Sequence, residues 1–195
     1  MSYRIADFGP SDILTSPKEV VRRVQVDPGN TGFFDGREFR YFREMTVAAN
    51  TSAWIRVTVP SEGIIIKEQD IFVDDGAVRF RAWRDLTISG VTWTPPASPT
   101  SGLYPNNGLP SAEPWTMQTV IENGGNHTTL SGGTVSEIHR VRSSGATAQR
   151  ISVGQTNVSE RGIPPGVYHL QFEALSGQPT TVIYDLRFEE RLGQG

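Results

Sequence analysis

The chain has 195 residues, a net charge of −3 and no cysteine. This length suits one domain, or one domain with an arm, and a chain of this size buries roughly 70% of its unfolded surface. The lack of cysteine excludes a disulfide scaffold, a thiol nucleophile and thiolate metal sites. The small charge, without a Lys- or Arg-rich stripe, argues against nucleic acid and membrane surfaces as partners.

The N-terminal region, residues 1–34, predicts an extended arm. Glycine, proline and aspartate interrupt any periodicity there, and residues 27–30 form the turn cluster Asp-Pro-Gly-Asn. The first residues lack the apolar run of a signal peptide, and no stretch reaches the ~18 apolar residues of a membrane span. The arm is either a loose terminus or a segment that orders on a neighbouring subunit. Its apolar residues would then be the anchors: Ile5, Phe8, Ile13 and Leu14.

From residue 39 onward the hydrophobic pattern has the period of two that is typical of strands. One face of residues 51–59 is apolar and consists of Ala53, Ile55, Val57 and Val59. Trp54 interrupts the opposite, polar face and indicates a contact there. Residues 64–66 are three isoleucines and predict a buried strand. Residues 71–73 and 77–83 flank Asp74-Asp75-Gly76, which predicts a hairpin with Val78, Phe80 and Ala82 facing inward.

Residues 94–114 differ in kind because they contain six prolines. Proline removes backbone donors, so this segment cannot be a central strand, and we predict a long loop. Leu103 and Tyr104 are among its apolar anchors, which favours an ordered excursion that contacts a partner over a free linker.

The second half returns to the strand pattern. We predict strands at 115–122, 134–143, 150–154, 167–174 and 181–191, with a glycine turn at 131–133 among the connections. The last two strands read as a hairpin with one wet face, which would carry His169, Gln171, Glu173, Asp185, Arg187 and Glu189. Its inward residues would be Tyr168, Leu170, Phe172, Ala174, Val182, Tyr184, Leu186 and Phe188. The fold class is therefore all-β: an antiparallel β-sandwich or jelly roll with an extended N-terminal arm and long Pro/Gly-rich loops. We place the arm at 1–34 and the sandwich domain at 35–195.

The sequence offers little catalytic chemistry. His127, His139 and His169 lack a partner at metal-ligand spacing, and a β-turn accounts for residues 74–76 better than a calcium loop. No nucleophile elbow or phosphate loop is present, and the scattered glutamates do not define a carboxylate pair. We predict no enzyme, no catalytic residue, no cofactor and no metal. Trp54, Trp83 and Trp93 could stack on sugars, although tryptophan in a sandwich is more often a core or interface anchor.

Several stretches resemble a family of tailed-bacteriophage virion proteins. They are residues 32–44 (GFFDGREFRYFRE), 57–60 (VTVP), 75–79 (DGAVR), 140–168 and 188–191 (FEER). The resemblance covers most of the chain from 32 to 191. It implies a small β-sandwich subunit on the capsid surface or in the tail, without known catalysis.

The resulting expectation is a non-enzymatic virion protein, assembled in the host bacterial cytoplasm and bound to capsid or other virion proteins. A capsid decoration (cement) protein on the outer capsid surface is the first hypothesis. We expect a homo-oligomer, with a trimer favoured, because a closed ring removes exposed strand edges. The alternatives are a tail-associated or receptor/glycan-binding module, and a glycan-cutting enzyme. The predicted partner-binding residues are Ile5, Phe8, Ile13, Leu14, Trp54, Leu103 and Tyr104.

Overall fold

The computed structural model describes Gly32 and residues 35–105, 115–143, 149–152, 162–175 and 177–191, with backbone alone for residues 149–152. The predicted arm therefore lies outside the described residues except for Gly32. Four of the predicted partner-binding residues fall there: Ile5, Phe8, Ile13 and Leu14. The boundary between arm and domain stays a prediction.

The described residues form strands and short connections. The strands are β1 (Glu38–Val47), β2 (Ser52–Val59), β3 (Ile64–Val73), β4 (Ala77–Ser89), β5 (Trp93–Thr94), β6 (Ser101–Pro105), β7 (Val120–Gly124), β8 (Thr129–Arg142), β9 (Gln149–Ser152), β10 (Gly162–Ile163), β11 (Gly166–Ala174) and β12 (Thr180–Glu190). No helix of this part of the chain is long and apolar enough to cross a membrane.

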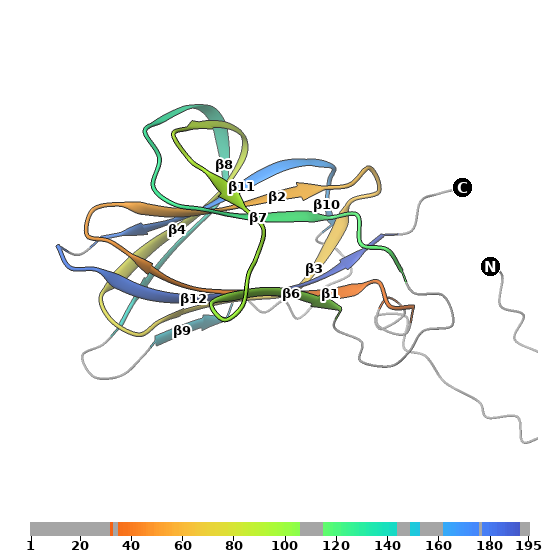
Figure 1. Cartoon of the computed structure of the whole chain (residues 1–195), viewed down its shortest axis with the longest axis horizontal. Helices are drawn as coiled ribbons and strands as arrows, with labels where there is room; N and C mark the ends of the chain where they lie inside the picture. The colour runs from red at the N-terminus through yellow and green to blue at the C-terminus, as the bar shows by residue number, and fades with distance from the viewer. Residues whose placement is uncertain are drawn as a thin grey trace, which may run out of the picture.

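The strands form two antiparallel sheets that pack face to face (Figure 1). The first sheet has the order β6-β1-β12-β3, and both β9 and β10 pair with the other side of β3. The second sheet has the order β5-β7-β2-β11-β4-β8. The chain crosses between sheets at β1–β2, β2–β3, β3–β4 and β11–β12, so that β12 lies beside β1 and β11 beside β2. This winding is that of a jelly roll, with β5, β6 and β7 added between β4 and β8.

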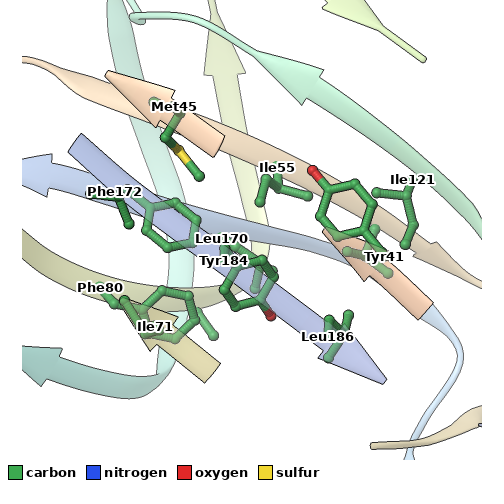
Figure 2. Close-up of a cluster of buried hydrophobic side chains, with 14 of the residues drawn as sticks. Tyr41, Met45, Ile55, Ile71, Phe80, Ile121, Leu170, Phe172, Tyr184 and Leu186 are labelled. Carbon is green, nitrogen blue, oxygen red and sulfur yellow. The ribbon is translucent and has the colours of Figure 1, made fainter. Parts of the chain in front are cut away.

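The core lies between the sheets and follows the period-two pattern. Phe80 and Phe172 of the second sheet meet Tyr184 of the first, with ring centroids 5.2 to 6.0 Å apart (Figure 2). The predicted inward residues of β2, β4, β11 and β12 are buried, except that Tyr168 is only partly covered. The predicted orientation of these four strands is therefore confirmed.

Both predicted hairpins are wrong, because the strands on either side of each turn belong to different sheets. β3 pairs with β12, β9 and β10, whereas β4 pairs with β11 and β8. β11 likewise pairs with β2 and β4, and β12 with β1 and β3. Sheets pack only ~10 Å apart, so a turn of a few residues can cross from one to the other as easily as it can close a hairpin.

The wet face predicted for β11 is also wrong. His169 and Gln171 point away from the core, yet both are buried. Trp93 packs on His169 with ring centroids 5.6 Å apart, and Trp83 Nε1 donates to Gln171 Oε1 at 3.1 Å. Side chains from β4 and β5 thus cover the middle of β11 on the outer face of the second sheet. Gln171 is held by hydrogen bonds to Arg81 and Trp83 of β4 and to Ser52 of β2.

Three further predictions need correction. The segment 94–114 is not loop throughout, since β6 pairs with β1 at the edge of the first sheet, a position that tolerates its proline. The predicted strand 115–122 begins only at Val120. The predicted turn at 131–133 lies inside β8, where Gly132 and Gly133 have φ of 66° and 81° and let the strand pass close to Leu86.

Candidate functional site

Three of the predicted partner-binding residues lie in the described part of the chain, and they differ in exposure. Trp54 is 0% exposed, with its Nε1 donating to His127 Nδ1 at 3.2 Å, so its ring belongs to the subunit interior. Leu103 packs against the core. Tyr104 is 49% exposed and is the most exposed of the three.

Tyr104 lies on the outer face of β6 and forms part of an aromatic and charged surface. Its ring stacks on Phe42 of β1, with centroids 6.1 Å apart and planes 21° apart. It also lies over Gly102, where a Cβ would come within 2.3 Å of the ring, so glycine is needed for this contact. We call Arg40, Phe42 and Tyr104 the edge surface.

Arg40 supplies the charge of the edge surface and is fixed by Asp185. Arg40 Nε donates to both carboxylate oxygens of Asp185 at 3.1 Å, and Nη2 adds a further hydrogen bond. This pairing raises the pKa of the Arg40 guanidinium above its ordinary value. Ordered arginine beside exposed aromatic rings is the composition of protein interfaces.

The strand that carries Tyr104 is at the edge of its sheet. Within the described residues β6 pairs with β1 only, which leaves the backbone groups of its other side without a strand. Such an edge can accept a strand or loop from another chain. The edge surface therefore combines side chains and backbone that both suit contact with a protein.

A second feature is a hollow of about 560 Å³ at the end of the sandwich where β1 leads into β2. It lies between the two sheets and is bordered by the segment that connects β5 to β6. We call it the Arg43 pocket. Its lining comprises residues 43–48, 51–53, Thr94, Pro95, Ala97, Thr100, Ser101, Asn123, Gly125 and Asn126.

Arg43 is a charged residue at an inward position of β1. It lies two residues from both Tyr41 and Met45, which are core residues, and so belongs to the same inward face of the strand. Its Nη1 donates to Trp54 O at 2.6 Å and its Nη2 to Gly124 O at 3.3 Å, so it links the first sheet to β2 and β7 of the second. Burial lowers the pKa of its guanidinium. No acidic side chain of the described residues forms an ion pair with it.

The polar wall of the Arg43 pocket is held by a short hydrogen-bond chain. Tyr41 OH donates to Asn123 Oδ1 at 2.6 Å, and Asn123 Nδ2 donates to Ser101 Oγ at 2.9 Å. Ser101 Oγ in turn contacts both backbone groups of Ala97. Burial raises the pKa of the Tyr41 phenol, which keeps it a donor. These hydrogen bonds fix the orientation of the Asn123 amide and the Ser101 hydroxyl in the wall of the pocket.

A hollow of about 470 Å³ beside Glu190 has a different character. The Glu190 carboxylate is 1% exposed and accepts hydrogen bonds from Trp115 Nε1, Gln118 N, Thr119 N and Thr119 Oγ1 at 2.6 to 3.1 Å. Its acceptor capacity is therefore used within the subunit. We assign it a structural role, that of fixing residues 115–119 against the end of β12.

Sequence reasoning did not single out Arg43, although the sequence carried a signal. Phe39, Tyr41, Met45 and Val47 alternate on one face, and Arg43 stands at the middle of that apolar row. An arginine in an inward register is a charge that the fold must accommodate, and it points to a site. Within the described residues, no group of three or more His, Asp or Glu side chains is placed to hold a metal ion. No protein-family model matches the chain, and the search of curated proteins finds no match.

Proposed function

We propose that the protein is a non-enzymatic structural subunit of a tailed-bacteriophage particle, and most simply a decoration protein on the outer capsid surface. The observation that supports assembly is the half-exposed Tyr104 stacked on Phe42 at a sheet edge. The resemblance of residues 32–44, 140–168 and the other stretches above supports the phage particle as its location. In this proposal the edge surface contacts a capsid subunit or a second copy of the chain.

The proposal is tested by changing Tyr104 to Asp and measuring incorporation into particles. An aspartate keeps the edge soluble but removes the ring and places a charge in the interface, where it would be desolvated. We expect the folded subunit to keep its melting temperature within a few degrees while its incorporation falls at least about tenfold, because interface aromatics often carry 2 kcal/mol or more. Copurification with sedimented particles, quantified on gels, is the measurement.

Val167→Asp is the matched control, since Val167 is 39% exposed on the second sheet, away from the edge surface. Normal incorporation of the Tyr104 variant would refute the assignment of this surface. Copy number in the same gels separates the proposals for location: hundreds per particle support decoration, and a few copies support the tail. We further propose a homotrimer, which the mass of the full chain from light scattering tests.

The tail-associated or glycan-binding alternative has one observation in its favour, namely the polar Arg43 pocket. This pocket is separate from the edge surface in chemistry and in position between the sheets, so each can be tested alone.

A further inference from the structure

Arg43 is a cation that the described residues do not neutralise. Arg43 is partly buried, and a charge withdrawn from water without a counter-charge is costly unless it is paired or binds a ligand. Within the described part of the chain its two hydrogen-bond partners are the backbone carbonyls Trp54 O and Gly124 O, which are dipoles and carry no net charge. A guanidinium has five N–H donors, so further donors remain for an acceptor in the pocket. The group that suits them is a carboxylate or another oxyanion.

Glu44 lines the pocket but does not fill this role. Neighbouring residues of a strand point to opposite faces, so an inward Arg43 places the Glu44 side chain on the outer face of the sheet, where it is exposed. Its backbone N donates to Thr100 O at 2.7 Å, and Thr100 also lines the pocket, so the backbone of Glu44 borders the pocket. The charge inside the pocket is therefore positive.

The remaining lining defines the rest of the ligand. Thr51 and Asn126 offer a hydroxyl and an amide group. Thr51 Oγ1 donates to Ala48 O at 2.9 Å and can still accept, while Asn126 Oδ1 accepts from Ser52 N at 3.3 Å, which leaves its Nδ2 to donate. Among the described residues, no tryptophan, tyrosine or phenylalanine lines the pocket, so this lining has no ring on which a nucleobase would stack. Its volume of about 560 Å³ lies in the range of small-molecule sites.

We propose that the Arg43 pocket binds a sugar acid, a polyhydroxylated ligand with one carboxylate. The carboxylate meets the guanidinium of Arg43, and the sugar hydroxyls exchange hydrogen bonds with Thr51 and Asn126. The hydrogen bonds of Asn123 to Tyr41 and Ser101 already hold the wall of the pocket in place, which reduces the entropy lost on binding. The inference does not depend on the edge surface or on the particle to which the subunit belongs.

Calorimetric titration of the full chain tests the proposal with three sugar acids: glucuronate, galacturonate and N-acetylneuraminate. Glucose and inorganic phosphate serve as the neutral and the non-sugar probes. We expect at least one sugar acid to bind saturably, with glucose and phosphate at least about tenfold weaker, because the charge and the hydroxyl groups both contribute.

Two variants locate the binding. Arg43→Lys keeps the charge but loses the planar fork and should weaken binding by about tenfold or more. Since Arg43 also bridges the sheets, Ala97→Phe provides a second variant that keeps Arg43 and fills the hollow from an exposed position; it should abolish binding. Arg187→Lys, on the outer face of the first sheet, is the control and should bind as the wild type does.

Three results would overturn the proposal. They are the absence of binding by all three sugar acids, equal binding of glucose or phosphate, and unchanged binding by Ala97→Phe. None of them bears on incorporation of the subunit into particles, so the failure of this inference and the failure of the proposed function are distinguishable.

Discussion

Glu190 is fully buried and Arg43 partly buried, and the two show different ways in which one subunit accommodates such a charge. Glu190 is surrounded by N–H and O–H donors from residues 115–119, and those hydrogen bonds replace its hydration. Arg43 has two carbonyl partners and faces a hollow. The first arrangement is closed and structural, whereas the second leaves capacity for a ligand.

We expect Glu190→Gln to destabilise the protein. The amide keeps the shape of the side chain but loses the negative charge and turns an NH₂ group toward donors, which leaves hydrogen bonds unmade. The free energy of unfolding should fall by about 2 kcal/mol or more, the range for buried donors that lose a hydrogen bond to a charged group. Urea unfolding at pH 7 measures it. The control is Glu62→Gln, an exposed change at the same hollow, which should cost little; equal stability of both variants would contradict the structural role of Glu190.

His169 is a buried histidine whose environment opposes protonation. Its pKa falls to about 4, first because burial removes water and second because the Arg56 cation lies near. Its Nδ1 has no hydrogen-bond partner among the described residues. The side chain of such a histidine is neutral in the folded protein and binds a proton more readily in the unfolded chain.

Acid should therefore cost the protein stability through His169. The folded pKa lies below the ordinary value of 6.5, so the contribution is fully present above pH 6.5 and is lost as the pH falls toward 4. The shift in the pKa of His169 corresponds to about 3 kcal/mol of unfolding free energy. Solvent screening at the sheet surface reduces the expected loss of stability in acid to about 2 kcal/mol. Unfolding free energies at pH 7 and pH 4.5 should show a smaller loss for His169→Gln than for the wild type. Parallel pH dependence of the two proteins would exclude this role.

At the scale of the strand, the sequence pattern predicts which face of a strand points inward. It does not predict which strands pair with each other. The alternation in 78–82 and 182–188 reports only the side on which a residue lies, and the structure confirms it. Partner choice depends on whether a turn crosses between sheets. Here Asp74 N donates to Thr181 O and Leu175 N to Ala77 O, so the two sheet-crossing connections support each other. Neither contact is visible in a local pattern.

The cover on the outer face of β11 was likewise beyond a local pattern. Polar residues at 169 and 171 predicted a wet face, but Trp93, from a distant segment, lies on His169. Of the two candidate sites, one is predicted from the sequence and the other is not. Tyr104 was predicted as a contact residue and is exposed, while the Arg43 pocket needed the fold, because its walls come from β1, β2, β6 and β7.

The core strand β11 gives a prediction at this scale. Phe172 is fully buried against Phe80 and Tyr184, so Phe172→Ala should leave a cavity and cost ~3 to 5 kcal/mol. Val167→Ala on the same strand removes an exposed side chain and should cost less than ~1 kcal/mol. Denaturant unfolding of the two variants is the measurement. Similar costs for both would show that β11 is not anchored through Phe172.

At the scale of the whole molecule, the jelly roll leaves edges that another chain could cover. β8 has 14 residues and, in the described part of the chain, pairs on one side with β4, with Ile138 57% exposed. β6 is an edge of the other sheet and carries Tyr104. A long edge with exposed apolar residues favours self-association unless it is covered. Closed symmetric assembly would cover such edges, which is the physical reason for proposing a trimer.

The N-terminal arm is the second element proposed to bridge subunits, and its removal separates assembly from folding. Deletion of residues 1–31 retains Gly32, whose carbonyl accepts from Arg37 N at 2.7 Å and whose Cα packs closely on Glu189. All the strands and the buried core residues described above remain, so the melting temperature should change by only a few degrees, as followed by circular dichroism. If the arm docks on a neighbour, the truncated subunit should no longer sediment with particles, while the full chain does. Normal incorporation would make the arm dispensable for bridging. A truncated chain that fails to fold would instead show that residues before 32 belong to the domain, and the predicted boundary at 34 would be wrong.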